Sequence, residues 1–87
     1  MRRYFFNLYD DDVALDEEGA ECLDLAAAKA RAFAGAREMA CAEVLQGLLT
    51  LDHRIEVVDE SGALVWTVHF GDVVTVRPAS AAWPGPQ

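Results

Sequence analysis

The chain has 87 residues, 53% of them hydrophobic and 25% charged, a composition typical of one small globular domain with a single modest core. Its net charge of −8, with only seven Lys and Arg, argues against binding to nucleic acid, because phosphate contacts require clustered cations. The same charge disfavours anionic membrane surfaces, and no apolar run approaches the ~20 residues of a membrane-spanning helix.

An aromatic run near the start predicts a β-strand from Arg3 to Tyr9. Alternate residues face opposite ways in a strand, and here both faces carry aromatic side chains, which favours a central position in a sheet. The preceding residues lack the apolar core of a signal peptide, so we expect the protein to stay in the cytoplasm.

The next residues, Asp10 to Asp24, hold eight of the fifteen acidic residues and no Lys or Arg; we call them the acidic segment. A short apolar island at Val13 to Leu15 and a turn at Asp16 to Gly19, with glycine at a positive φ, predict a short or ragged second strand.

Asp24 is placed as the N-cap of a helix that continues to about Gln46, with Gly47 as its C-terminal signal. Its apolar residues fall in one band around the helix, which therefore packs against a sheet. This band consists of Leu25, Ala32, Phe33, Ala36, Met39, Ala40 and Val44, and we expect Phe33 and Met39 to be its bulky contacts.

Two further strands, Arg54 to Asp59 and Leu64 to Phe70, form an antiparallel hairpin around a type I turn at Asp59 to Gly62, closed by a left-handed glycine with a bulge. A last apolar stretch, Val73 to Val76, is expected to continue the sheet after a bend. From Pro78 onward the Pro- and Ala-rich residues predict a disordered tail, with Trp83 as its one large side chain.

Together these elements predict an α+β fold, in which one long helix packs on a three- to four-stranded antiparallel sheet in the order β-β-α-β-β. We expect residues 1–77 to form a single domain and residues 78–87 the tail.

Three stretches resemble a small bacterial family of unknown function, over Arg2 to about Val76. They are the RYFF-type first strand, the acidic DEEG turn leading into the Ala-rich helix, and the hairpin around Asp59 to Gly62. The resemblance implies short, stand-alone soluble proteins with this order of elements. It implies no catalytic or binding residues.

The acidic segment raises the possibility of a calcium site, because Asp10, Asp12 and Asp16 have suggestive spacing. However, Ala14 stands where an EF-hand loop needs an oxygen ligand, and the glycine and distal glutamate are out of register. A solvated loop that keeps the protein soluble and shields a sheet edge is the better interpretation.

The two histidines depend on the register of the hairpin. A bulged turn alone places His53 opposite His69, where the pair could share a metal; a slip of one residue separates them, and the apolar pattern favours that slip. Metal sites also need further ligands at recognisable spacing, so we predict no metal and no cofactor.

No nucleophile is persuasive, so we do not predict an enzyme. Ser61 lies in a turn, and Cys22 lies between acidic residues that would raise the pKa of a thiol. Cys22 and Cys41 are interpreted as free thiols packed as small apolar groups.

Because one helix covers only one face of a sheet, we expect the opposite face to be apolar, with Phe5, Val58, Val65 and Tyr9 on it. The sequence therefore predicts an interaction module, either a homodimer or a protein that docks on a partner. The alternative is a small ligand- or metal-binding protein that uses the acidic segment or the two histidines.

Overall fold

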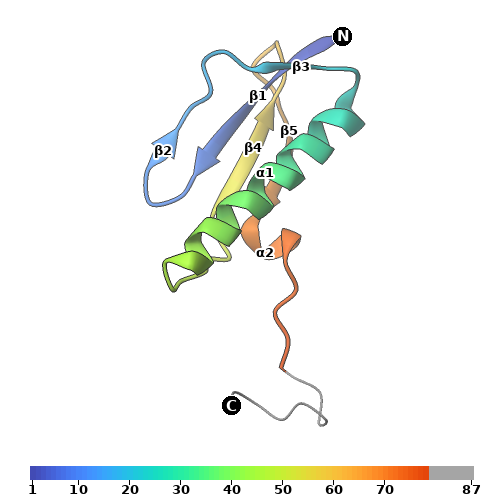
Figure 1. Ribbon diagram of the computed structural model, residues 1–87. Coiled ribbons are helices and arrows are strands. Elements are labelled where there is room, and N and C mark those ends of the chain that lie inside the picture. Colours follow the sequence, from blue (N-terminus) through green and yellow to red (C-terminus); the bar gives the residue numbers. More distant parts are fainter. Residues whose placement is uncertain (79–87) are drawn as a thin grey trace.

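The computed structural model describes residues 1–78. A single sheet is formed by β1 (Arg2–Tyr9), β2 (Val13–Ala14), β3 (Ala20–Cys22), β4 (Arg54–Val58) and β5 (Leu64–His69). The long helix α1 (Leu25–Leu45) lies across one face, and the short helix α2 (Phe70–Val73) lies beside it (Figure 1). The predicted class, α+β with one main helix and an antiparallel sheet, is confirmed. The order differs, because the acidic segment contributes two strands instead of one, giving β-β-β-α-β-β.

The first strand organises the sheet. All pairings are antiparallel, and β1 lies between β4 on one side and β2 on the other, with β5 beyond β4. The acidic segment pairs with both ends of β1. Ala14 of β2 opposes Leu8 of β1, and Ala20 of β3 opposes Tyr4 of β1. The ragged second strand that the sequence predicts is therefore an interrupted strand, and the residues between its two parts pass beside the middle of β1.

Both ends of α1 are as predicted. The carboxylate of Asp24 accepts a hydrogen bond from Ala27 N at 2.8 Å, which satisfies one of the free N–H groups of the first turn. At the other end, Gly47 N donates to Val44 O and Leu48 N donates to Glu43 O, the bonding pattern of a Schellman motif.

The contact face of α1 is narrower than predicted. Its fully buried residues are four alanines spaced four apart: Ala28, Ala32, Ala36 and Ala40. The partly buried Phe33 packs beside them, but Met39 and Val44 are 40% and 56% exposed. The 100° periodicity identifies the apolar side of the helix but not which residues on that side are buried most deeply. The prediction that Met39 is a bulky core contact was therefore wrong. The methyl groups allow α1 to lie close to the sheet.

The hairpin contains a bulge that changes its register. The turn forms as predicted, since Asp59 N donates to Ala63 O at 2.9 Å and Gly62 N donates to Asp59 O at 3.0 Å. Hydrogen bonds from the Ser61 hydroxyl and from Ala63 N also hold the pKa of the Asp59 carboxyl below its ordinary value. The ladder then shifts by one residue between Val57 and Val58. This shift turns Trp66 and Val68 of β5 toward α1.

After β5 the chain does not continue the sheet as predicted. Instead His69 N donates to the Asp72 carboxylate at 2.9 Å, and residues 70–73 form the single turn of α2. Arg37 of α1 holds this turn, because its Nε donates to Val73 O at 3.0 Å. Phe70 is thereby buried in the core. The predicted tail and Trp83 lie outside the described residues, apart from Pro78.

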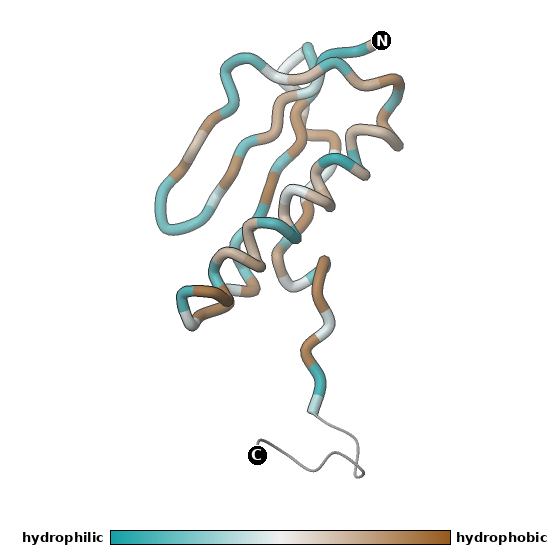
Figure 2. The backbone as a smooth tube through the Cα atoms, viewed as in Figure 1, coloured by the Kyte–Doolittle hydropathy of each residue, from teal (hydrophilic) through white to brown (hydrophobic). Residues whose placement is uncertain are grey.

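Exposed apolar residues gather at the C-terminal end of α1 (Figure 2). We call this group the helix-end patch; its members, 49% to 85% exposed, are Val44, Leu45, Leu48 and Leu51. Within residues 1–78, none of the helices has the length and apolar character needed to cross a membrane.

Candidate functional site

Between β2 and β3, the acidic segment is held against β1 by Asp16. Asp16 Oδ2 accepts a hydrogen bond from Phe6 N at 3.1 Å, and Asp16 N donates to Asn7 Oδ1 at 2.8 Å. Its other oxygen accepts from Glu18 N and Gly19 N, at 3.2 Å and 2.9 Å, which closes the turn. Asp16, predicted as a possible calcium ligand, is therefore a structural anchor in this fold.

These contacts change the acidity of Asp16. Partial burial acts to raise the pKa of its carboxyl, but the N–H groups of Gly19, Phe6 and Glu18 stabilise the charged form, and Arg31 adds to their effect. The net result is a pKa below the ordinary value for aspartate. The anchor is thus strongest when it is ionised.

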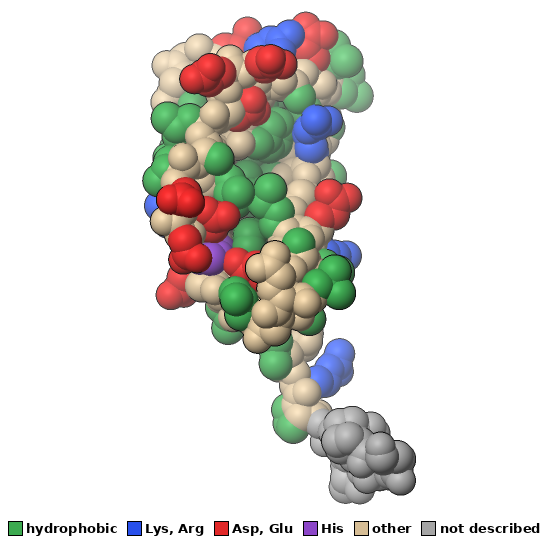
Figure 3. All heavy atoms as spheres, turned by 60° about the vertical axis from the view of Figure 1, so that its left-hand side comes forward, with side chains coloured by type: hydrophobic (Ala, Val, Ile, Leu, Met, Phe, Trp, Pro, Cys, Tyr) green, Lys and Arg blue, Asp and Glu red, His purple; other side chains and the backbone are tan. Residues whose placement is uncertain are grey.

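A groove of about 740 Å³ separates this anchored segment from α1. Its floor is made by Phe6, Leu8 and Ile55 of the sheet; its walls are residues 15–20 on one side and the Arg31 to Met39 stretch of α1 on the other. Figure 3 shows hydrophobic side chains at the bottom of this hollow, with acidic side chains around it.

The groove is open because the helix presents small residues to it. Ala34 and Gly35 line its wall, and a Cβ added at Gly35 would meet only Ile55 Cδ1, at 3.6 Å. Two larger apolar side chains stand at the rim without being covered, since Leu15 is 62% and Met39 40% exposed. An apolar floor with uncovered apolar side chains beside it is a property of binding surfaces.

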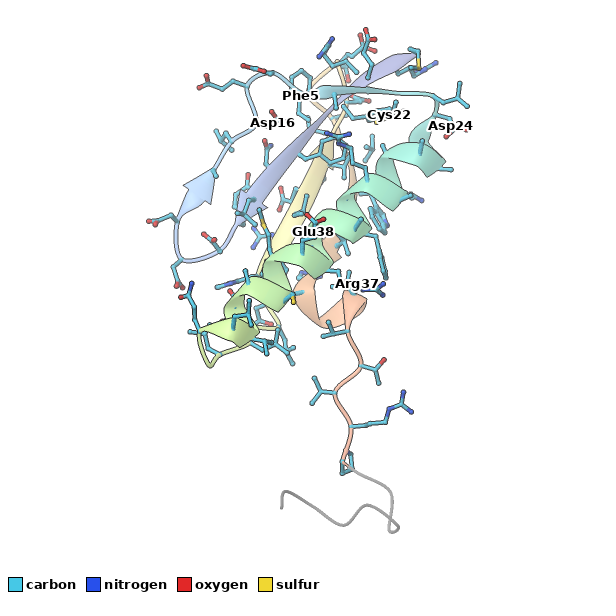
Figure 4. The ribbon with its side chains drawn as sticks, viewed as in Figure 1. Phe5, Asp16, Cys22, Asp24, Arg37 and Glu38 are labelled. Atoms are coloured by element: carbon cyan, nitrogen blue, oxygen red, sulfur yellow. The ribbon has the colours of Figure 1, made fainter. Side chains whose placement is uncertain are left out.

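The charges around the groove are mostly negative. Glu17 and Glu18 come from the acidic segment and Glu38 from the facing side of α1. Figure 4 shows Glu38 and Asp16 on the two sides of this space, with Arg37 on the other side of the helix, toward α2. Arg31 is the cation of the lining, and it lies 5.6 Å from the centre of the Phe6 ring. A cationic, partly apolar ligand would therefore complement the groove.

A second hollow, of about 330 Å³, continues the groove past Leu8 and Met39, which line both. We call it the His53 hollow, because His53 forms part of its wall together with Asp10, Asp11 and Glu43. His53 is buried, and its Nδ1 lies 2.6 Å from Glu43 Oε2. The ring also packs edge-on against Phe70, with ring centres 5.5 Å apart.

His53 and His69 are separated in the structure, in the register that the apolar pattern favours. His69 opposes Arg54 in the ladder, and it binds Asp72, while His53 precedes β4 and binds Glu43. The bulge in the hairpin causes this separation. Asp12 also lies apart, in the exposed turn where its N donates to Asp10 Oδ1. Within residues 1–78, no three His, Cys, Asp or Glu side chains are grouped as metal ligands.

The face of the sheet opposite α1 is only partly apolar. Phe5 opposes Val58 and Val58 opposes Leu64, so one end of this face is apolar. Val65 does not join them, because the bulge turns it toward the core, where it lines a small hollow with Tyr4 and Leu25.

The remainder of this face is polar. The Arg54 guanidinium binds Glu56 at 2.8 Å and lies 4.5 Å from the centre of the Tyr9 ring. Asn7, Glu56 and Thr67 oppose one another across three strands. The apolar part of this face is therefore smaller than the sequence predicts.

The two cysteines are free thiols in different surroundings. Cys22 is buried in the core, as predicted, but Cys41 is exposed on α1. Neither cysteine lines the groove or the His53 hollow.

Sequence reasoning missed the groove and the partner of His53. The sequence does give one indication of the groove, because Leu15 and Met39 are apolar residues close to acidic residues in the chain. No such signal exists for the contact of His53 with Glu43, because it depends on how the end of α1 meets the start of β4.

The sequence model of a domain of unknown function (DUF6894) matches residues 3–71. This region begins in β1 and ends within α2, so it contains the residues that line both hollows. No curated protein and no solved structure matches the chain. The sequence predicted a family of unknown function, and its bacterial origin stays a prediction. The chain is a member of the DUF6894 family.

Proposed function

We propose that the protein is a non-catalytic interaction module, which binds a basic segment of a partner protein in the groove between α1 and the acidic segment. The observation that carries this proposal is the combination of an apolar floor, formed by Phe6, Leu8 and Ile55, with a rim of carboxylates. Apolar side chains of the partner would fill the groove, and its Lys or Arg side chains would bind the rim.

The charges favour this partner over others. The rim carboxylates would repel an acidic segment, and the net charge of −8 would speed the approach of a basic one. Because exposed charges are screened by salt, affinity should fall as ionic strength rises. Apolar contacts should preserve part of the affinity at high ionic strength.

The proposal is tested with two fluorescent peptides of equal length, one of alternating Leu and Lys, the other with Glu in place of Lys. We expect only the basic peptide to bind in fluorescence anisotropy. Ala34→Trp should weaken binding at least about tenfold by filling the groove. Ala26→Trp is the matched control, because Ala26 is also exposed on α1 but does not line the groove.

The role of charge is tested separately. Glu38→Lys places a cation at the rim, whereas Asp52→Lys makes the same change of net charge away from the groove. We expect a much larger loss of affinity for Glu38→Lys. Equal losses in the two variants would mean that the peptide responds to net charge only, and binding by Ala34→Trp at full strength would contradict the groove as the site.

Self-association is the second candidate function, and the helix-end patch favours it. Leu45 is 85% exposed, and the four residues of this patch are uncharged in an otherwise strongly acidic protein. An uncharged apolar surface of this kind gains free energy when a second copy covers it.

Sedimentation velocity over a range of concentrations should show a dimer that Leu45→Glu dissociates. Leu23→Glu is the control, because Leu23 is 74% exposed at the other end of α1. A monomer at the highest concentration would count against this candidate and would leave the peptide-binding proposal standing.

A further inference from the structure

The His53 hollow is built around a histidine that is held in one orientation. The side chain of His53 is only 10% exposed, and three elements contact it: Glu43 from α1, Asp11 from the turn between β1 and β2, and Phe70 from α2. The backbone also fixes it, because Phe70 N donates to His53 O at 2.8 Å. The ring therefore cannot turn without disrupting the core.

Glu43 determines which ring nitrogen carries the hydrogen. Its Oε1 accepts from Thr50 N at 2.8 Å, and its Oε2 lies 2.6 Å from His53 Nδ1. An ionised carboxylate only accepts hydrogen bonds, so Nδ1 must be the donor in this contact. In the neutral imidazole this leaves a lone pair on Nε2.

That lone pair is directed toward acidic side chains. Nε2 lies 3.5 Å from Asp11 Oδ1, which is longer than an ordinary N–H···O hydrogen bond. Asp11 is 98% exposed, and Asp10 lines the same hollow. No Lys or Arg is among the lining residues. When His53 is neutral, the hollow thus presents one buried nitrogen acceptor beside two carboxylates, those of Asp10 and Asp11.

We propose that the His53 hollow is a subsite for a guanidinium group, supplied by an arginine side chain of the bound segment. Guanidinium has parallel N–H donors in a rigid fork, which suits two acceptors 3.5 Å apart, and its flat faces pack well against apolar side chains such as Leu8 and Met39. The preference for a guanidinium group follows from the residues that line the hollow. That the group belongs to a protein segment rests on the proposed function.

The test uses N-butylguanidinium and its neutral isostere N-butylurea, followed by NMR of the ¹⁵N-labelled full chain. We expect saturable shifts of the His53 ring nitrogens and of the Asp11 and Met39 amides with N-butylguanidinium only. Asp11→Asn should weaken binding at least about tenfold, since hydrogen bonds to charged groups are among the strong ones. Asp52→Asn, the same change elsewhere, should leave it unaltered.

A second variant reverses the polarity of the ring. In Glu43→Gln the amide oxygen still accepts from Thr50 N, so the NH₂ group faces Nδ1 and the hydrogen moves to Nε2. Long-range ¹H–¹⁵N spectra report this tautomer directly, and N-butylguanidinium binding should be lost. Equal shifts with N-butylurea, or unchanged binding after the tautomer has moved, would overturn the proposal.

The outcome is separable from that of the proposed function. Binding of N-butylguanidinium without binding of the basic peptide would retain the subsite and refute the peptide groove. Binding of the basic peptide, together with no response of His53 to N-butylguanidinium, would support the peptide groove and refute the subsite.

Discussion

Gly19 lies directly against the ring of Phe5. A Cβ added to Gly19 would fall 3.0 Å from two carbons of that ring and 2.7 Å from the Tyr4 carbonyl oxygen. The φ of Gly19 is also positive, at 71°, a conformation that costs an L-residue energy. The acidic segment can therefore approach β1 this closely only with glycine here.

We expect Gly19→Ala to destabilise the protein by about 2 to 3 kcal/mol, since strain of the backbone adds to the steric clash. Gly62→Ala is the control, because Gly62 has a φ of 86° but no atoms within 4 Å of its added Cβ. It should cost only about 1 kcal/mol. Urea unfolding of both variants gives the comparison, and equal losses would show that the contact with Phe5 has no steric cost.

The second prediction concerns acid. The pKa of Asp16 is lower in the folded protein than in the unfolded chain, so its stabilising effect is complete above pH ~4. That effect is lost as the pH falls through the lowered value. Asp16→Asn should therefore cost about 1 kcal/mol at pH 7 and progressively less below pH ~4. Because the variant retains Asp59, whose pKa is lowered too, the difference between the two proteins isolates Asp16.

Gly35 provides a stabilising change. It lies within α1, where glycine is unfavourable, and its added Cβ would make an ordinary contact with Ile55 Cδ1 at 3.6 Å. Gly35→Ala should raise the free energy of unfolding by about 0.5 to 1 kcal/mol. Thermal and urea unfolding measure this directly. A loss of stability would mean that the helix lies closer to Ile55 than the structure places it.

The fourth prediction compares two glutamates on α1. Glu43 satisfies Thr50 N and the buried His53, and removing its carboxylate leaves both without a partner. Glu43→Ala should cost about 2 kcal/mol or more. Glu38→Ala, at an exposed position on the same helix, should stay within about 0.5 kcal/mol of the parent. Similar free energies of unfolding for the two variants would contradict the role assigned to Glu43.

The sequence predicted those parts of the fold that local patterns determine. Asp24 and Gly47 marked the ends of α1, and the turn from Asp59 to Gly62 was placed correctly, because caps and turns depend on residues a few positions apart. The single turn of α2 was missed, since it depends on Arg37 binding Val73 O across 36 positions of the chain.

The candidate site was less predictable for the same reason. Asp16 is a candidate metal ligand by residue type alone, but its bonds to Phe6 N and Asn7 form only when the segment folds back on β1. For His53 and His69, the apolar pattern of the strands favours the register that separates them, and this is the register of the structure. Composition indicated a negative surface and could not indicate the groove within it.

The row of four alanines on α1 also acts as a spacer. Their methyl groups set the height of the helix above the strands, and with it the width of the groove floor beneath Met39. A larger side chain in this row would overpack the contact between α1 and the sheet and displace the helix. The buried alanines therefore help to determine the dimensions of the groove.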